Sequence, residues 1–257
     1  MSTLALAARD SSTMVRRQLK RLIRYPSMTI QLIITPVILL LLFVYVFGGT
    51  LGKGLGGGRD VYVNYVLPGI LLMAAATAAT GTAVMVATDM TEGIIARFRT
   101  MRISRASVLT GHVVGSVIQQ LLGMAVLIGI ALAIGFRPNA TAIEWVAAAG
   151  LLTLFVLAIT WLAVALGLKS STPEAASNAP MPLIVLPFLG SGFVPTDSMP
   201  TVLRWFAEYQ PFTPIMETIR GLLLGTPIGN SAAIATAWCV GIAAVSYLWA
   251  RNTFNKA

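Results

Sequence analysis

Residues 61–88 read "VYVNYVLPGILLMAAATAATGTAVMVAT" and contain no Asp, Glu, Lys or Arg. An α-helix rises about 1.5 Å per residue, so about 20 apolar residues are enough to cross the hydrocarbon core of a membrane, which is about 30 Å thick. The stretch is long enough for that crossing and apolar throughout most of its length. It therefore predicts a transmembrane helix.

The same pattern recurs along the chain. Only 11% of the residues are charged and 56% are hydrophobic, whereas a soluble domain carries roughly a quarter of charged residues. A β-barrel would show short alternating segments instead of continuous apolar runs. We therefore predict an all-α integral membrane protein, a single transmembrane domain over residues 1–257 with six transmembrane helices. The other five uncharged windows are residues 25–52, 106–136, 145–168, 175–196 and 221–250.

The basic residues predict how the chain sits in the membrane. Given the order of the predicted spans, 13 of the 18 Lys and Arg residues fall on the side that carries both termini. That side holds the whole formal charge of +9, and the opposite side is neutral. Because Lys and Arg concentrate in cytoplasmic loops, we expect a multi-pass protein of the cell membrane with both termini in the cytoplasm. Topology and anionic lipid headgroups account for the charge, so no nucleic-acid partner is expected.

A glycine-rich stretch at residues 48–60, "GGTLGKGLGGGRD", resembles a phosphate-binding loop at first sight. Such a loop needs four residues between its first glycine and the Gly-Lys pair, followed by a hydroxyl residue that holds magnesium. Here three residues separate Gly48 from Gly52, and Gly54 follows Lys53. The stretch also lies on the predicted external side, so we interpret it as an external loop and expect no ATPase activity from this chain.

Other catalytic or metal-binding groups cannot be assigned either. His112 is the only histidine and Cys239 the only cysteine, which leaves no evident metal-ligand cluster or nucleophile–base pair. The middles of the six windows are uncharged, whereas ion-coupled transporters usually carry an intramembrane ionisable group. We predict that the chain is not an enzyme, that it binds no metal or cofactor, and that any energy for transport comes from a partner.

Residues 3–25 are predicted to form an interfacial helix. Arg16, Lys20 and Arg24 recur every four residues, and Leu19 and Ile23 fall on the opposite face. An apolar face in lipid and cations at the phosphates are typical of a helix that lies in the membrane interface. A basic tail that only sets the topology is the alternative.

Residues 89–105, "DMTEGIIARFRTMRISR", predict a short amphipathic helix between the second and third spans. Asp89 and Glu92 resemble a capping box, and an apolar stripe of Ile94, Phe98 and Met101 follows. A helix of this kind on the cytoplasmic side either anchors to headgroups or docks into a groove of a soluble partner, which we favour. Its four arginines are Arg97, Arg99, Arg102 and Arg105.

Residues 195–225 are too polar to cross the membrane and yet are rich in aromatic side chains. Pro211 and Pro214 interrupt the segment at "QPFTP", which predicts two short helices that dip into the outer interface. Glu217 and Arg220 are spaced for an i, i+3 pair.

In the second span, small residues such as Ala75, Ala79 and Gly81 favour close helix packing. The alternative is a polar pathway along the Thr hydroxyls of that span.

Two stretches resemble a known family: "EGIIARFRTMRISRASVLTG" at residues 92–111 and "SGFVPTDSMPTVLRWFAEYQPFTPIMETIRGLLLG" at residues 191–225. Together with the rest of the chain they resemble the membrane subunit of a type-2 ABC exporter, in the daunorubicin-resistance permease branch. The resemblance implies two six-helix subunits, each with an amphipathic elbow helix at residues 3–25. Each would contact a cytoplasmic ATP-binding cassette subunit, which carries ATP and Mg, through a coupling helix at residues 89–105.

The resemblance also assigns roles to residues. The coupling interface would comprise Glu92, Ile94, Arg97, Phe98, Arg99, Met101, Arg102 and Arg105. A substrate path along the first, second and fifth spans would include Tyr45, Met73, Thr77, Thr80, Asn178, Phe188 and Phe193. An external gate in the re-entrant helices of residues 195–225 would include Trp205, Phe206, Gln210, Phe212, Glu217 and Arg220.

The expected function is ATP-driven export of hydrophobic or amphipathic compounds, such as drugs, lipids or polyketide-like molecules. A second permease subunit, identical or paralogous, and membrane lipids are the other expected partners. Export of a polysaccharide or glycolipid by the same fold is one alternative. A non-transport immunity or scaffold protein of the membrane is another.

Overall fold

The structure is a computed structural model that describes residues 26–92 and 105–256. In these residues the chain is helical, with short turns and loops and no strands. The predicted elbow helix at residues 3–25 and residues 93–104 of the predicted coupling helix lie outside the described residues. The elements are α2 (Pro26–Leu41), η1 (Leu42–Phe47), α3 (Gly48–Gly54), α4 (Arg59–Thr91), α6 (Arg105–Ala133), α7 (Ala142–Lys169), α8 (Pro173–Asn178), α9 (Met181–Val185), η2 (Leu186–Leu189), η3 (Thr196–Ser198), α10 (Thr201–Tyr209), α11 (Phe212–Leu224) and α12 (Ser231–Lys256).

Five helices in the described part of the chain are long and apolar enough to cross a membrane. The all-helical membrane fold predicted from the sequence is therefore confirmed. Five of the six predicted windows overlap these helices, but the ends differ. The largest difference is in the last window, which was predicted from residue 221, whereas residues 221–224 belong to α11 and the span begins at Ser231. The five spans are Leu32–Gly54, Arg59–Thr91, Val113–Ala133, Ala142–Lys169 and Ser231–Phe254.

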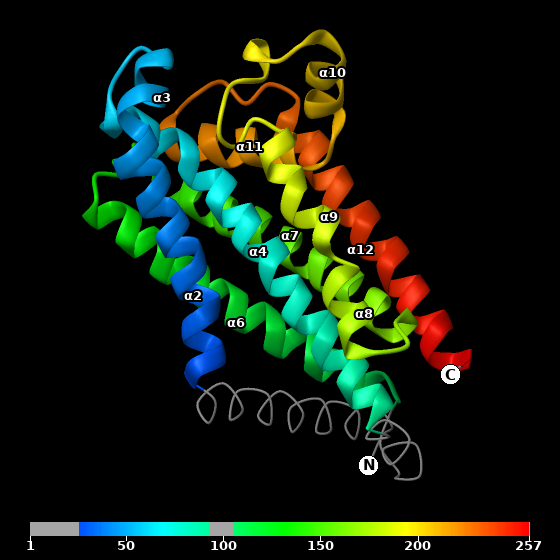
Figure 1. The fold of residues 1–257 in the computed structure, drawn as a ribbon. Coiled ribbons are helices and arrows are strands. Elements are labelled where there is room, and N and C mark those ends of the chain that lie inside the picture. The colour runs from blue at the N-terminus through cyan, green and yellow to red at the C-terminus, as the bar shows by residue number, and fades with distance from the viewer. Residues whose placement is uncertain (1–25, 93–104, 257) are drawn as a thin grey trace.

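The window at residues 175–196 differs from the prediction of one continuous helix. It holds most of α8, all of α9 and η2, and none of these is long enough to span a membrane. Pro180, Pro182 and Pro187 fall between or within the pieces. Because proline has no backbone N–H and its ring clashes with the preceding turn, closely spaced prolines break a helix. The pieces nevertheless run one after another along α4 (Figure 1).

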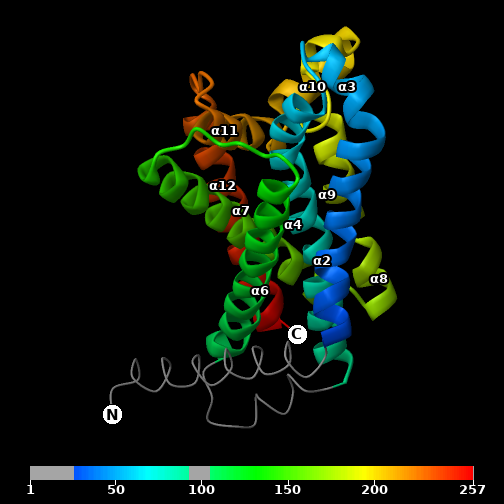
Figure 2. The ribbon, with the colours of Figure 1, turned by 90° about the vertical axis from the view of Figure 1, so that its left-hand side faces the viewer.

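The core of the bundle forms where α4 meets α7. Gly167 of α7 lies so close to α4 that a Cβ atom there would come within 2.5 Å of the carbonyl oxygen of Ala83. Small side chains bring the two backbones together, as Ala79 and Ala83 are completely buried. Figure 2 shows α4 between α2 and α6, with α8 and α9 beside it.

The glycine-rich stretch at residues 48–60 starts as a helix and continues as a tight turn. A π-helical turn, η1, leads into α3, which covers Gly48–Gly54. The amides of Leu55 and Gly57 both donate to the carbonyl of Gly52, at 3.0 Å each. These amides are bonded within the turn and are not free to cradle a phosphate. The stretch was interpreted as an external loop, whereas its residues 48–54 are helical and belong to the first candidate span.

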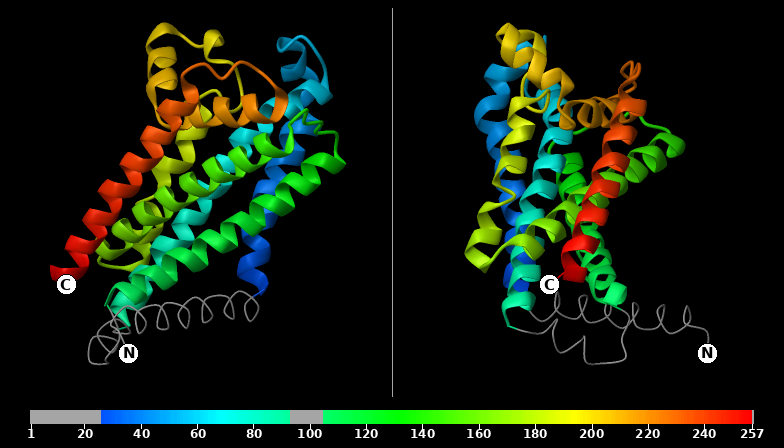
Figure 3. Two further views of the ribbon diagram at one scale, coloured as in Figure 1. Left: turned by 180° about the vertical axis from the view of Figure 1, so that it is seen from behind. Right: turned by 90° about the vertical axis from the view of Figure 1, so that its right-hand side faces the viewer.

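The two ends of the bundle carry different segments. α3, α10 and α11 gather at one end, and α11 lies across that end of the bundle (Figures 1 and 3). The C-terminal end of α12, the end of α4 and the start of α6 lie at the opposite end. The predicted gate segment and the break between Glu92 and Arg105 are therefore at opposite ends of the molecule.

Candidate functional site: a polar cavity within the helix bundle

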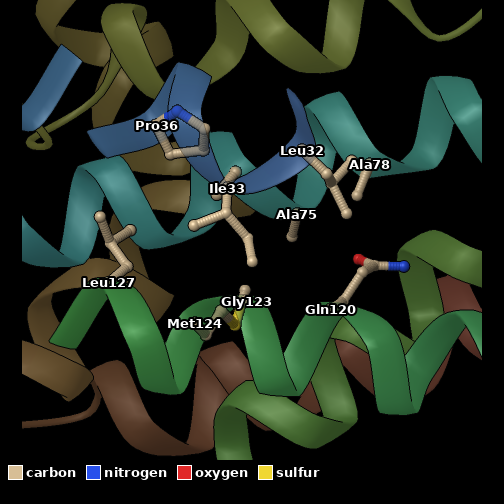
Figure 4. Close-up of a pocket in the computed structure, with 10 residues that line it drawn as sticks. Leu32, Ile33, Pro36, Ala75, Ala78, Gln120, Gly123, Met124 and Leu127 are labelled. Carbon is tan, nitrogen blue, oxygen red and sulfur yellow. The ribbon is translucent and has the colours of Figure 1, made fainter. Parts of the chain in front are cut away.

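A cavity of about 370 Å³ opens between α2, α4, α6 and α9. Seven of the residues that line it carry a hydroxyl or an amide, and none of those in the described part of the chain is Asp, Glu, Lys or Arg. A smaller pocket of about 20 Å³ adjoins it and shares Leu32, Ala78 and Gln120 (Figure 4). The polar lining of the large cavity comprises Thr35, Thr77, Thr80, Thr82, Ser116, Gln119 and Gln120.

The residues of α4 that line the cavity are spaced as on one face of a helix. Thr77, Gly81 and Met85 recur every four residues, so they lie on one face of the helix, with Thr80 beside them. The Thr77 hydroxyl donates to the carbonyl of Met73 at 2.9 Å. Thr80 Oγ1 is buried and has no hydrogen-bond partner among the described residues.

The wall from α6 is joined to both of its neighbours by hydrogen bonds. Thr82 of α4 donates to Ser116 Oγ at 3.2 Å. On the other side, Gln120 Nε2 donates to Thr160 Oγ1 of α7 at 3.1 Å, and Thr160 is completely buried. Gln120 itself is only 4% exposed, and its Oε1 has no partner among the described residues. Figure 4 shows its amide reaching into the space between α6 and the helices α2 and α4.

Two polar atoms of the lining residues, Thr80 Oγ1 and Gln120 Oε1, are buried without a partner among the described residues and have almost no accessible surface. A buried donor or acceptor without a partner costs about 1–3 kcal/mol, so such atoms are normally satisfied by water or by a ligand. A cavity of this volume and polarity accommodates several water molecules or part of an organic molecule. The cavity is open on one side, where Thr35 and Gly81 are exposed, and its lining offers hydroxyl and amide groups but no charge to a molecule that enters it.

The residues of the predicted substrate path do not form one site and fall into four groups. Thr77 and Thr80 line the cavity. Met73 is buried in the core. The rings of Phe188 in η2 and Phe193 in the loop after it stack with centroids 4.4 Å apart, and η2 contacts α10. The remaining two, Tyr45 and Asn178, are exposed side chains away from the cavity lining.

Sequence reasoning missed the polar residues of the third span. Ser116, Gln119 and Gln120 lie in the uncharged window of residues 106–136, which was judged by its lack of charge alone. Two adjacent glutamines in the middle of an apolar span are the signal that could have identified this wall, because an amide in a membrane span needs a partner inside the protein. Thr35 of α2 was missed for the same reason.

Arg220 of the predicted gate joins three segments. Its Nη2 donates to the carbonyl of Ser191 at 2.7 Å and to that of Tyr65 at 3.1 Å. The guanidinium also lies over the Tyr65 ring, 4.0 Å from the centroid. Burial lowers the pKa of this guanidinium from its ordinary value. Glu217 does not form the predicted ion pair with it among the described residues, and its carboxylate accepts a hydrogen bond from Ser231 Oγ at 3.3 Å.

The other predicted gate residues divide into buried anchors and exposed aromatics. Gln210 is buried, and its Nε2 donates to the carbonyl of Leu186 at 3.1 Å. Phe212 packs edge-on against Phe155 of α7 at a centroid distance of 5.4 Å. In contrast, Trp205 and Phe206 of α10 are 65% and 40% exposed. The segment is thus anchored through α11 and presents aromatic side chains on α10.

Only the two ends of the predicted coupling interface are described. Glu92 is exposed at the end of α4, where its amide donates to the carbonyl of Thr88 at 2.9 Å. Arg105 is the first residue of α6. The residues between them that were assigned to this interface, Ile94, Arg97, Phe98, Arg99, Met101 and Arg102, lie outside the described residues.

Comparison with known proteins identifies the family. Residues 10–224 match the sequence model of the ABC-2 type transporter family. Over 224 residues the chain is 27% identical to the "Daunorubicin resistance ABC transporter permease protein DrrB1" of Streptomyces coeruleorubidus, a match that covers 86% of this chain and 77% of that protein. Over 214 residues it is 24% identical to the "Probable doxorubicin resistance ABC transporter permease protein DrrC" of Mycobacterium tuberculosis (strain CDC 1551 / Oshkosh), which covers 83% and 78% of the two chains. The matched range takes in every helix that lines the cavity, and the chain therefore belongs to the ABC-2 type transporter family.

Proposed function

We propose that this chain is the permease subunit of an ATP-driven exporter of hydrophobic or amphipathic compounds, with the drugs named for its relatives as the first candidates. The observation that carries the proposal is the uncharged polar cavity inside a bundle of membrane-spanning helices. An amphipathic molecule suits a site of this kind, in which Leu32, Ala78 and Ile184 supply apolar contacts and the hydroxyl and amide groups orient it. ATP and Mg belong to a separate ATP-binding subunit in this proposal.

The assembly follows from the family. Two permease subunits face each other, and each binds one ATP-binding subunit on the cytoplasmic side. Residues 3–25 form the elbow helix, both termini are cytoplasmic, and α8, α9 and η2 complete a sixth crossing as a broken segment. The aromatic side chains of α10 meet lipid headgroups at the outer surface.

The proposed coupling follows from how the cavity walls are connected. α4 ends at Thr91 and α6 begins at Arg105, so residues 93–104 join the two helices that face each other across the cavity. A displacement of this segment by the ATP-binding subunit would move α4 and α6 relative to α2. Because the Thr82–Ser116 hydrogen bond also joins α4 to α6, the two helices would respond together. Glu92, Ile94, Phe98 and the arginines of the segment are proposed as the contact surface.

The first test is a mild-detergent purification of the full chain from its own cells, followed by identification of the proteins that accompany it. A stoichiometric soluble protein with Walker A and B motifs is the expected partner. Efflux of daunorubicin, followed by its fluorescence, should then require both proteins and the Walker lysine of the partner. Absence of such a partner, with efflux equal to that of cells lacking the chain, would favour a membrane protein that does not transport.

A further inference from the structure

The broken segment made of α8, α9 and η2 ends in a stretch of chain that leaves the α-helical hydrogen-bond pattern. In an α-helix the carbonyl of Leu186 would accept from the amide of Gly190, but that amide donates to the carbonyl of Pro187 at 3.4 Å. Gly190 and Ser191 are buried, so their backbone groups are shielded from water. These groups need hydrogen-bond partners from elsewhere in the protein.

Side chains of the segment that closes this end of the bundle supply the partners. Gln210 Nε2 donates to the carbonyl of Leu186 at 3.1 Å. Thr213 Oγ1 accepts from the amide of Ser191 at 3.3 Å, and Arg220 Nη2 donates to the carbonyl of the same residue at 2.7 Å. Figure 1 shows α9 leading to the end of the bundle that carries α10 and α11. We refer to the three side chains, Gln210, Thr213 and Arg220, as the clamp.

The loop of residues 190–192 fits closely against the clamp. A Cβ atom at Gly190 would lie 2.7 Å from Thr213 Oγ1 and would clash with Gln210 Nε2. A Cβ atom at Gly192 would lie 2.8 Å from Met216 Sδ, also on α11. The loop can therefore approach α11 this closely only because both positions are glycine.

The hydrogen bonding of the clamp is incomplete. Ser191 Oγ, Gln210 Oε1 and Arg220 Nε are each buried without a hydrogen-bond partner among the described residues. If the loop left the clamp, these atoms would gain hydrogen bonds to water, which would offset part of what the clamp loses. A fully satisfied network has no such compensation. The clamp is therefore easier to release than an ordinary buried polar contact.

The clamp holds a segment that forms one wall of the cavity. Ile184 of α9 lines the cavity and lies just before Leu186, the first residue that the clamp binds. α9 packs mainly against α4, and at its C-terminal end it continues into η2. The position of this wall therefore depends on the clamp as well as on the contact with α4.

We propose that Gln210, Thr213 and Arg220 form a releasable clamp, and that its release frees α9 and with it the cavity wall at Ile184. The three are positioning residues, because they act through the backbone of residues 186–191 and none of them lines the cavity. The inference goes beyond the proposed function, since it concerns how one end of the bundle controls the cavity wall, whatever compound the cavity takes up.

The test measures how often the clamped loop opens. Ser191→Cys is the reporter, since the two side chains are similar in size and Ser191 Oγ has no hydrogen bond to lose. The purified full-length chain in lipid nanodiscs is treated with N-ethylmaleimide, and mass spectrometry follows the reaction at residue 191. The native Cys239 is completely buried in α12 and reports general unfolding in the same sample.

Thr213→Val removes the hydroxyl at nearly constant volume and should raise the reaction rate at residue 191 roughly fivefold, as expected for the loss of about one hydrogen bond. Gln210→Leu should also raise it, whereas Thr213→Ser should keep the original rate. Thr218→Val is the matched control, because Thr218 is also buried on α11 and its hydroxyl donates to Pro214 of the same helix. The rate at Cys239 should be the same in all variants.

The movement of α9 is measured by distances between spin labels in a Cys239→Ser background. Labels at Val185→Cys and Leu122→Cys, both at exposed positions, report α9 relative to α6. Labels at Leu122→Cys and Val146→Cys report α6 relative to α7 and serve as the reference. Thr213→Val should broaden the first distance distribution and leave the second unchanged.

Three results would overturn the inference. They are equal rates at residue 191 with and without Thr213→Val, a parallel increase at residue 191 and Cys239, and an unchanged distance distribution for α9 in Thr213→Val. Because neither ATP nor a partner is present, these outcomes are independent of export. A clamp that behaves as expected, in a chain that shows no ATP-dependent efflux, would support the inference and contradict the proposed function.

Discussion

Arg220 Nη2 lies 2.7 Å from the carbonyl oxygen of Ser191, and the guanidinium stands over the ring of Tyr65. One side chain of α11 thus holds the loop after η2 and the first half of α4 together. Ser191 is itself buried, and its amide donates to Thr213 Oγ1 of α11 at 3.3 Å. This cluster connects the segment that closes one end of the bundle to the central helix.

Replacing Arg220 with Met should lower the thermal stability of the purified protein. The change removes two charge-assisted hydrogen bonds to backbone carbonyls and a cation–π contact, which together contribute about 2–4 kcal/mol at a partly buried site. The midpoint of thermal unfolding in detergent, followed by size-exclusion fluorescence, measures the loss. Arg204→Met is the control, because the ion pairs of Arg204 with Asp197 and Glu208 lie on an exposed surface and should contribute little. Equal midpoints for Arg220→Met and the unmodified protein would contradict the assigned role.

Gly69 is a second point at which α4 meets the loop after η2. A Cβ atom at this position would lie 2.7 Å from the carbonyl oxygen of Gly192, so the added methyl group cannot fit without a shift of the backbone. Gly69→Ala should destabilise the protein by about 1–3 kcal/mol, as overpacking commonly does. Gly150→Ala in α7 is the matched change, since a Cβ atom there meets nothing within 4 Å. It should be neutral or slightly stabilising because Ala favours helix. Unfolding midpoints of the two variants provide the comparison, and similar values for both would refute this packing argument.

The predicted orientation can be tested with single cysteines in a Cys239→Ser background. Gly54 is exposed at the end of α3, and a Cβ atom there meets nothing within 4 Å. Gly54→Cys should therefore react with a membrane-impermeant maleimide in intact cells. Ser171→Cys, in the exposed turn between α7 and α8, should react only after lysis. The reverse pattern would place both termini outside the cell.

The coupling role of residues 89–105 can be tested with Phe98→Asp. A charge in the apolar stripe should abolish stimulation of the partner ATPase by substrate, while membrane insertion remains intact. Measurements are ATPase activity in reconstituted vesicles and the amount of protein in the membrane fraction. Val202→Asp is the control, because Val202 is exposed on α10 and has no role in the predicted gate, and this variant should keep the stimulation by substrate. Normal stimulation in Phe98→Asp would show that this segment does not transmit the signal.

Only a small part of the cavity lining was among the residues predicted from the sequence. The hydroxyls of Thr77 and Thr80 were visible as polar groups in an apolar span, and both line the cavity. Gln120 was equally visible, but its hydrogen-bond partner Thr160 lies 40 residues away along the chain. The partners of Arg220 are more distant still, since Tyr65 is separated from it by 155 residues. The i, i+3 spacing in the sequence had predicted Glu217 as the partner of Arg220.

The amino-acid sequence alone determined that this is a membrane protein, because the cost of placing charge in hydrocarbon acts on each window independently of the others. Its motifs also pointed to the family, since they are read along a continuous stretch of chain. The tertiary structure decided which polar groups face the cavity, which way the Gln120 amide points and which carbonyls Arg220 binds. These features depend on contacts between helices that are far apart in sequence, where the burial and geometry of each donor and acceptor are set by its neighbours. For residues 175–196 both kinds of information are needed. The sequence gives the positions of the prolines, and the structure shows that the short helices between them pack one after another along α4.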